Sequence, residues 1–247
     1  MEYVAVTALT HEGLVREHNE DSIVVGPWTT CATVTQTPET LFFPLDDPLL
    51  VAVADGLGGH SAGEVASTVV VQELARCCHA VDDEASLRAA LDQCNQAIYA
   101  AAEREPSWAG MGTTVAGLVV NDDSVHVFNV GDSRVYTRDE GELSQLSVDD
   151  NPPLAPGQTH TSVLAQTMGG HPGRAKIDAH VSTRERGAES RYLICTDGLS
   201  DVVGADAIAD VLDSSRGGQA VYQLWRAAID AGGPDNITIL TVEFASR

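Results

Sequence analysis

A single α+β domain, in which helices cover antiparallel sheets, is the architecture that the sequence predicts. Strand-like apolar runs occur near the start, in the middle and at the end of the chain, for example at 49–54, 191–195 and 237–244. Two long segments with helical spacing of apolar residues follow the central run. Neither an internal repeat nor a linker divides the 247 residues, so we expect one domain over residues 1–247.

The chain is strongly acidic, with 14 Lys and Arg residues against 36 Asp and Glu, a formal net charge of −22. Nucleic acids and anionic membranes require a basic face, so neither is an expected partner. The sequence shows neither an apolar run of the roughly 20 residues that span a membrane nor the pattern of a signal peptide. The five cysteines form no CxxC pair, which favours a cytoplasmic location over a zinc site or a disulfide framework.

Valine-rich alternation predicts a first strand over 3–9, and a short apolar run predicts another over 23–25. Residues 26–48 contain four prolines and many threonines, so we expect an inserted loop there. Within it, 41–43 either packs on the surface or forms a short edge strand. The apolar run 49–54 predicts a buried strand.

Helical spacing predicts a helix over 62–78, opened by a capping box of Ser61 and Glu64. A second helix begins at the acidic residues 82–84, whose charge suits the helix dipole. The remaining elements are listed in chain order: an antiparallel meander of strands at 113–120, 125–130 and 135–137, a short helix at 162–168, a strand at 191–195, helices at 205–212 and 219–229, and a strand at 237–244.

Acidic residues stand at the ends of several predicted strands. Two strands end in Asp-Gly, at Asp55 and Asp197, and Asp235 leads into the last strand. Glu20 and Asp21 precede the strand at 23–25. Carboxylates gathered in this way, without a cluster of His or Cys, predict oxygen-ligated Mg²⁺ or Mn²⁺ rather than zinc.

Each segment has a simpler interpretation on its own. An Asp-Gly pair is usually an ordinary turn, and Arg16 with its acidic neighbours is typical of a solvated loop. Together they favour a site in which two ions activate water while Arg16 binds phosphate oxygens. Asp132, in Gly-Asp-Ser-Arg, is expected to organise a turn between strands, and we leave it out of the site.

Six segments resemble, in order, the motifs of the PP2C family of metal-dependent serine/threonine protein phosphatases, in particular its bacterial members. They are REHNED at 16–21, ADGLGGHSAGEVAS at 54–67, GMGTT at 110–114, NVGDSR at 129–134, CTDGLS at 195–200 and GGPDNIT at 232–238. Together they cover essentially the whole chain. The resemblance implies a four-layer αββα sandwich, in which two antiparallel sheets lie between helix pairs.

By position, the resemblance implies that Asp55 bridges two metal ions and that the carbonyl of Gly56 binds one of them. Asp197 and Asp235 would bind the other ion.

Three further residues have implied roles. Glu20 resembles the acid that holds metal-bound water, and Asp21 resembles its neighbour in the same network. Arg16 resembles the arginine that binds the substrate phosphate.

The implied activity is hydrolysis of phosphoserine and phosphothreonine in proteins by a hydroxide that bridges two Mn²⁺ or Mg²⁺ ions and attacks in line. The expected partners are phosphorylated proteins, including a Ser/Thr kinase and its targets, and the expected state is a monomer. Two other functions stay open: an inactive relative that binds phosphoproteins as a regulator, and a phosphatase of small molecules.

The sequence also departs from the family. Leu57 stands where animal members have a histidine that is proposed as the general acid. Residues 106–109 lack the carboxylate on which many bacterial members place a third ion, and the nearest acid is Glu105. Two ions are therefore expected, and a third is left open. The segment from 150 to 170, where the family has a flap, is short and proline-rich. As donor of the proton to the leaving group, we favour a metal-bound water held by Glu20 or Asp21 over His60.

Overall fold

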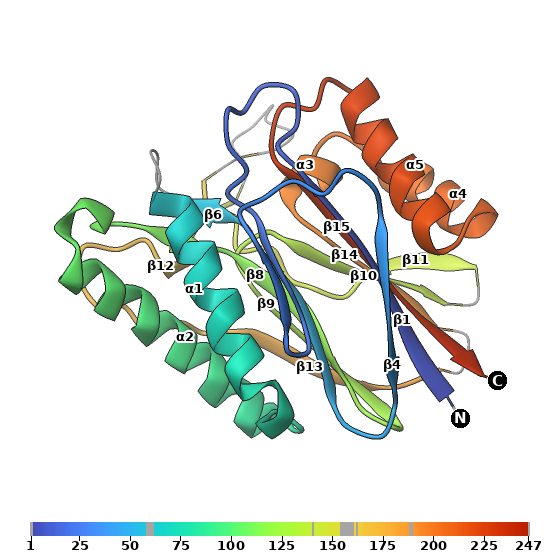
Figure 1. Ribbon diagram of the computed structural model, residues 1–247, viewed down its shortest axis with the longest axis horizontal. Helices are drawn as coiled ribbons and strands as arrows, with labels where there is room; N and C mark the ends of the chain where they lie inside the picture. Colours follow the sequence, from blue (N-terminus) through green and yellow to red (C-terminus); the bar gives the residue numbers. More distant parts are fainter. Residues whose placement is uncertain are drawn as a thin grey trace.

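The computed structural model describes residues 2–57, 62–139, 141–153, 161, 163–187 and 190–246. Two six-stranded antiparallel sheets lie face to face, and helices cover the outer face of each (Figure 1). This four-layer arrangement is the αββα sandwich that the resemblance implies, so the predicted fold class is confirmed.

The first sheet contains both ends of the chain. Its first and last strands pair along ten residues, from Glu2 opposite Ser246 to His11 opposite Ile237. In spatial order its strands are β11 (Glu142–Gln145), β10 (Arg134–Asp139), β14 (Arg191–Cys195), β15 (Ile237–Ser246), β1 (Glu2–His11) and β4 (Glu39–Pro44). Helices α4 (Ala205–Ser214) and α5 (Gly217–Asp230) lie on its outer side (Figure 1).

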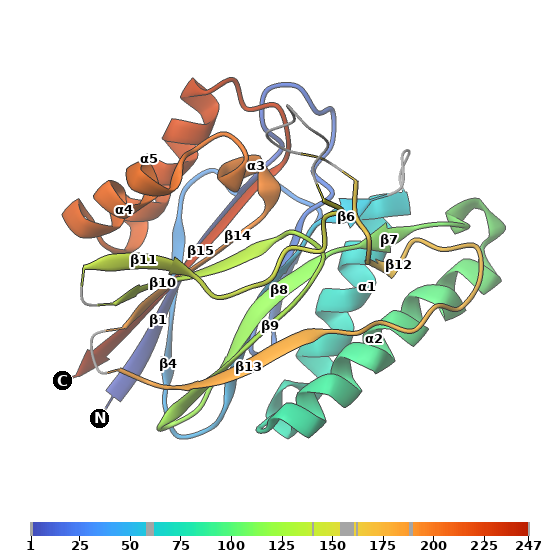
Figure 2. The ribbon, with the colours of Figure 1, turned by 180° about the vertical axis from the view of Figure 1, so that it is seen from behind.

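The second sheet is built around the central apolar strand. Its strands in spatial order are β13 (His180–Glu185), β9 (Ser124–Val130), β8 (Val115–Val120), β5 (Leu49–Ala54), β2 (Ser22–Val25) and β3 (Trp28–Cys31). Helices α1 (Ala62–Cys77) and α2 (Glu84–Arg104) lie side by side on its outer face (Figure 2). Asp83 caps α2 by accepting a hydrogen bond from the amide of Ser86 at 2.7 Å.

Short elements fill one end of the sandwich. Three two-residue strands form a small sheet in the order β12 (Met168–Gly169), β7 (Gly112–Thr113) and β6 (Gly56–Leu57). The one-turn helix α3 (Asp197–Ser200) follows β14 at this end. Two 3₁₀ turns lie at opposite ends of α2: η1 (Cys78–Ala80) before it and η2 (Pro106–Trp108) after it. A Cβ atom at Gly112 would lie 2.8 Å from the backbone nitrogen of Gly170. The close approach of these two segments therefore requires glycine at position 112.

Alternation along the central strand explains the layered core. Val51 and Val53 of β5 point into the space between the two sheets, whereas Leu50, Ala52 and Ala54 point toward α1 and α2. All six residues of β5 are buried. A third apolar layer, which includes Leu193 and Ile239, lies between the first sheet and its helices. Burial on both faces is what a continuous apolar run predicts.

Two expectations were wrong in part. Residues 26–48 are not a loop throughout, because β3 and β4 each pair with an inner strand; the alternative of an edge strand at 41–43 is confirmed. The meander ends at β9, because the turn at Gly131 (φ +97°) carries the chain to the other sheet, where β10 pairs with β14.

The helix expected at 162–168 does not form over its described residues. Side chains hold this segment open instead: Asn151 donates to the carbonyl of Val163 at 3.1 Å, and Gln166 donates to Asp150 at 3.0 Å. The proposed N-cap Ser61 lies outside the described residues. Among those that are described, no helix is long and apolar enough to cross a membrane.

The core of the second sheet provides a test of the packing. The fully buried ring of Phe128 lies over Gly117 on the paired strand, where an added Cβ would be 2.7 Å from it. We expect Phe128→Ala to lower the free energy of unfolding by about 3–5 kcal/mol. The matched change Phe42→Ala, at a ring that is 68% exposed on β4, is expected to cost less than about 0.5 kcal/mol. Urea denaturation of both variants measures the difference, and equal losses would contradict this packing.

Candidate active site

The acidic residues singled out in the sequence meet at one end of the sandwich. Asp55 follows β5, Asp197 opens α3 directly after β14, and Asp235 precedes β15. Glu20 and Asp21 precede β2. In Figure 1 the loop after β1, β6 and α3 gather at this end, opposite the two chain termini. Acidic residues at the strand ends of both sheets therefore lie at the same end of the sandwich.

Asp21 is fully buried among hydroxyl groups. Its Oδ2 accepts hydrogen bonds from the Oγ1 atoms of Thr238 at 2.6 Å and Thr196 at 3.0 Å. Its Oδ1 is buried and has no hydrogen-bond partner within the described structure. Burial raises the pKa of Asp21 to about 7, although the two threonine bonds favour the ionised form. This carboxyl group therefore has an oxygen for which the protein supplies no donor.

Asp55 is held in place through its backbone. Its carbonyl accepts hydrogen bonds from the Oγ1 of Thr113 at 2.7 Å and from the amide of Thr114 at 2.9 Å. The hydroxyl of Thr114 in turn lies 2.7 Å from that of Ser133. Burial, followed by the charges of neighbouring aspartates, of which Asp21 is the largest contributor, raises the pKa of Asp55 well above its ordinary value. The segments GMGTT and NVGDSR thus support this aspartate.

Asp197 occupies the first turn of α3. Burial and then the charge of Asp235 raise its pKa to about 8, and its Oδ1 is a second buried carboxylate oxygen without a partner in the described residues. A Cβ on Gly198 would lie 1.9 Å from the carbonyl of Asn236, so only glycine permits this approach of the two loops.

Asp132 belongs to the same cluster, which the sequence alone did not indicate. Its charge contributes to the raised pKa of both Asp55 and Asp197. Burial also raises the pKa of Asp132 itself, whose Oδ2 accepts a hydrogen bond from Asn151 at 3.2 Å. The expectation that it organises a turn is therefore incomplete, because that turn also brings its carboxylate toward the site.

Glu20 and Gly56 lie against each other and against the start of α1. A Cβ at Gly56 would be 2.8 Å from the carbonyl oxygen of Glu20, and one at Gly63 would be 2.8 Å from the Glu20 carboxyl. Burial raises the pKa of Glu20, and the charge of Arg16 opposes that shift. The two glycines leave room for this half-buried acid.

Arg16 is joined to one of the predicted metal ligands. Its Nη2 donates to Oδ2 of Asp235 at 2.7 Å, and about half of the arginine side chain is exposed. Phosphate binding was expected of Arg16 and metal binding of Asp235, and the structure places the two in direct contact. The guanidinium group therefore sits at the edge of the carboxylate cluster and faces solvent.

Asn236 is a second residue that the sequence did not single out. Its Oδ1 accepts a hydrogen bond from the amide of Glu20 at 2.8 Å, and its Nδ2 donates to the carbonyls of Glu12 at 3.1 Å and His18 at 2.9 Å. One buried side chain thus fixes the loop that carries Arg16 and Glu20 to the loop that carries Asp235. A buried asparagine with all its polar atoms satisfied is typical of such a joint.

The donor set consists of carboxylate oxygens, which suit hard divalent cations. Five aspartates, at positions 21, 55, 132, 197 and 235, act on one another electrostatically, and burial raises the pKa of four of them. Among the described residues, no group of three or more Asp, Glu, His or Cys side chains is already arranged to hold a metal ion. The fit rests instead on oxygen donors and on two buried carboxylate oxygens without partners, which a cation would satisfy.

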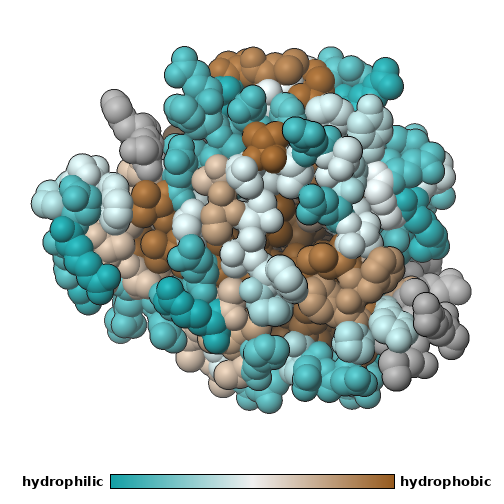
Figure 3. Space-filling model, in the orientation of Figure 1, coloured by the Kyte–Doolittle hydropathy of each residue, from teal (hydrophilic) through white to brown (hydrophobic). Residues whose placement is uncertain are grey.

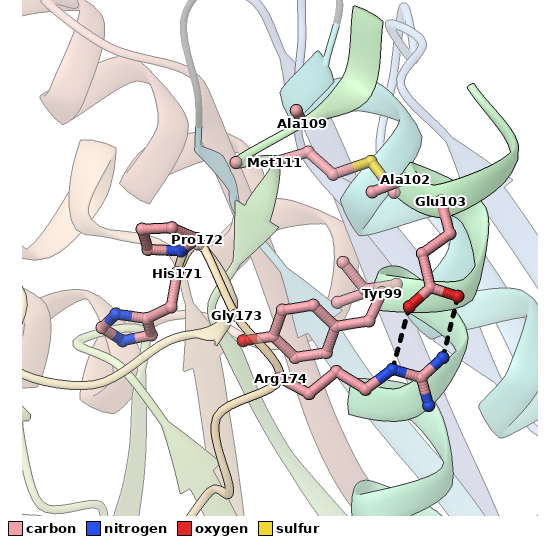
Figure 4. Close-up of a pocket in the computed structure, with 12 residues that line it drawn as sticks. Tyr99, Ala102, Glu103, Ala109, Met111, His171, Pro172, Gly173 and Arg174 are labelled. Atoms are coloured by element: carbon pink, nitrogen blue, oxygen red, sulfur yellow. Dashed lines mark hydrogen bonds and ion pairs between the residues drawn. The ribbon is translucent and has the colours of Figure 1, made fainter. Parts of the chain in front are cut away.

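A larger hollow of about 490 Å³ lies beside the small sheet, between α2, the turn at 109–111 and the loop at 170–174 (Figure 4). Arg174 donates to Glu103 through two hydrogen bonds of 3.0 and 2.9 Å, and Tyr99 accepts one from the amide of Ala175 at 3.2 Å. Arg174, Glu103 and Tyr99 thus already have hydrogen-bond partners in the chain around the hollow. The carboxylate cluster, rather than this hollow, is the candidate site. His60 and its neighbours at 58–61 lie outside the described residues.

Comparisons with known proteins agree with the geometry. The family model "Protein phosphatase 2C" matches residues 29–232. The chain is 34% identical to the serine/threonine protein phosphatase PstP of Mycobacterium tuberculosis over 96% of its own length, and it spans 44% of that protein. It is 30% identical to the serine/threonine phosphatase stp of Listeria welshimeri, covering 95% of this chain and 93% of the relative.

A solved structure of similar shape is the catalytic domain of PstP in complex with two manganese ions, with 32% identity, a TM-score of 0.81 and full coverage of both chains. Another similar structure is PppA, a key regulatory component of T6SS in Pseudomonas aeruginosa, with 26% identity and a TM-score of 0.79 over 99% of this chain and 100% of PppA. On the motifs, the fold and these matches, the chain belongs to the protein phosphatase 2C family.

Proposed function

We propose that the protein is a metal-dependent phosphatase that hydrolyses phosphoserine and phosphothreonine in proteins. The observation that carries the proposal is the cluster of buried aspartates with two partnerless oxygens, at the end of a sandwich that belongs to the protein phosphatase 2C family. A phosphate dianion is repelled by these aspartates unless cations neutralise them. Cation binding and phosphate chemistry therefore belong together at this site.

Asp55 would hold both ions, Gly56 would hold one through its carbonyl, and Asp197 and Asp235 would hold the other. The PstP catalytic domain, with two manganese ions, supports a pair of ions at such a site. When bound, such ions lower the pKa of water and neutralise charge on the transferring phosphoryl group. We propose two Mn²⁺ or Mg²⁺ ions, and a third ion stays open because the chain carries Glu105 but no acid at 106–109.

The chain's own residues bind and orient the substrate. Arg16, half-exposed at the rim, donates N–H groups to the phosphate oxygens. Burial raises the pKa values of Glu20 and Asp21, and one of these two acids would hold the water that protonates the leaving alkoxide. Asn236 holds the loop that carries Arg16 in position beside Asp235 through its hydrogen bonds to the carbonyls of Glu12 and His18.

The substrates we propose are phosphorylated proteins, among them a Ser/Thr kinase and its targets, and the proposed setting is a monomer in the cytoplasm. A small-molecule phosphatase is the alternative, and phosphopeptides compared with phosphorylated metabolites distinguish the two. An inactive regulator is the other alternative. The presence of Asp55, Asp197 and Asp235 argues against it.

Activity should depend on divalent cations. We expect hydrolysis of a phosphothreonine peptide in the presence of Mn²⁺ or Mg²⁺ and loss of that activity after treatment with a chelator, because the aspartates alone repel the substrate. Phosphate release measures both, and re-addition of the ion is the control for irreversible loss. Full activity after exhaustive chelation would refute the metal assignment.

Substitutions should separate metal binding from phosphate binding. Asp55→Ala or Asp197→Ala is expected to lower kcat by at least about a hundredfold, because each removes a ligand of a catalytic ion. Arg16→Ala is expected to raise KM by roughly tenfold with a smaller change in kcat. Asp235→Ala should change both constants, since this residue also contacts Arg16.

Arg226→Ala is a control, because this arginine is exposed on α5 and pairs with Asp230. Steady-state kinetics on one phosphopeptide compare all variants. If Arg16→Ala lowered kcat as much as Asp55→Ala with KM unchanged, the assigned roles would be wrong.

The cation-free protein should lose stability as the pH rises. Asp21 and Asp197 have pKa values of about 7 and 8 when folded, against 3.8 ordinarily. The folded state therefore binds more protons than the unfolded state between these limits, and its stability falls from about pH 4 up to about pH 8. We expect a lower Tm at about pH 8 than at about pH 6, and a larger rise on adding Mg²⁺ at the higher pH.

The double variant Asp21→Asn, Asp197→Asn is the control for the general repulsion of an acidic chain. Its Tm should vary less with pH than that of the unaltered protein. Identical pH profiles for the two would show that these carboxyl groups are not responsible.

A further inference from the structure

The open side of the sandwich carries an apolar surface that the proposed function does not use. Strands β3 and β4 are the last strands of their respective sheets on this side, and both come from the segment 26–48. Trp28, Val34, Leu41 and Phe42 are exposed there to 63%, 38%, 37% and 68%. Leu41 lies opposite Val6 and faces the space between the sheets, whereas Phe42 lies opposite Ala5 on the other face of this edge. We call these four side chains the β3–β4 surface. Figure 3 shows apolar atoms gathered around a hollow where β3 and β4 lie in Figure 1.

Strand β4 is an unprotected sheet edge. It pairs with β1 on one side, and no described strand pairs with its other side. Soluble proteins commonly protect such an edge with lysine, with proline or by covering it. The chain has no Lys or Arg from 17 to 75, and Pro44 stands only at the end of β4. The backbone of β4 is therefore open to pairing with a further strand.

The space behind this edge leads between the two sheets. A cavity of about 40 Å³ is lined by Val6 and Leu41 of the first sheet and by Ile23 and Trp28 of the second. Its volume suits the tip of one small apolar side chain. A strand added beside β4 would point alternate side chains toward this opening and toward solvent.

The charge around the surface selects the kind of strand. Glu39, Asp46 and Asp47 are exposed on β4 and on the turn that follows it, and none of them forms an ion pair with a described residue. The nearest cations along the chain are Arg16 and Arg76. A second copy of this chain brings another charge of −22 and the same acidic edge, which opposes pairing.

From the open edge, the apolar opening and the uncompensated acids, we propose that the β3–β4 surface binds an extended, basic segment of a partner protein. The segment adds a strand to β4 and places apolar residues at alternate positions toward Trp28 and Leu41. The Lys or Arg residues between them lie on the face of Phe42 and balance the acidic charge that Glu39, Asp46 and Asp47 give this edge. Strand addition of this kind takes its affinity from backbone hydrogen bonds and its specificity from alternate side chains. None of the residues that line the cavity beside β4 belongs to the carboxylate cluster, so we expect binding there to leave the active site free.

The probe is an octapeptide of alternating valine and lysine, added to the full chain labelled with ¹⁵N. We expect the backbone amide signals of β4 to shift on titration. The same peptide, N-methylated at alternate residues, keeps its charge and apolar content but cannot pair as a strand. It is expected to bind at least about tenfold more weakly.

Phe42→Lys and Leu41→Lys should each weaken peptide binding by about tenfold or more, because they place a cation on the edge and remove an apolar contact. Val148→Lys is the matched control: this valine is 54% exposed and lies just after β11, at the other edge of the sheet. Phosphatase activity and Tm of each variant verify folding, and both should stay unchanged.

Three results would overturn the proposal. Equal affinity of the two peptides would show general attraction of cations to an acidic protein. Equal binding by Phe42→Lys and Val148→Lys would place the peptide elsewhere. A dimer in light scattering that Phe42→Lys converts to a monomer would show that a second copy occupies the surface.

Discussion

Electrostatic repulsion between buried aspartates is the constraint around which this protein is built. Asp21, Asp55 and Asp197 raise one another's proton affinity because each is removed from water and faces like charge. Left alone, such groups would separate or draw in water. Here threonine hydroxyls from β15 and from the end of β14 bind Asp21, and the threonines of β7 and the turn beyond it hold the backbone of Asp55. These hydrogen bonds hold Asp21 and Asp55 in place against the repulsion between their carboxylates.

The two-sheet sandwich is what brings these residues together. Asp21 and Asp55 belong to one sheet, and Asp197 and Asp235 belong to the other, so the site spans the gap between them. Sheets packed through a close-fitting apolar layer cannot slide past each other at low cost. The valine-rich interior, with Val4, Val51 and Leu240 among its members, therefore fixes the separation of carboxylates that lie at its end.

Much of the site could be predicted from the sequence because its acidic residues directly follow or precede apolar runs. Such runs indicate where strands begin and end, even when the order of the strands in the sheets is unknown. Asp132 and Asn236 were missed for different reasons. The position of Asp132 depends on the crossing of the chain between sheets at Gly131, and no local pattern tells which sheet the next strand joins. Asn236 acts through backbone carbonyls of a loop more than two hundred residues away in the sequence. Strands β6, β7 and β12 are two residues long, too short for alternation to appear.

The contact between Arg16 and Asp235 has a thermodynamic consequence. Asp235 faces the carboxylate cluster and also holds the arginine at the rim, so one side chain serves two binding events. If occupancy of the cluster draws the carboxylate of Asp235 inward, Arg16 gains a free N–H for an incoming anion. Linkage then requires reciprocity: an anion held by Arg16 strengthens cation binding by the same factor by which the cation strengthens anion binding. A single ion pair can in this way make the two ligands cooperative without any movement of the sandwich.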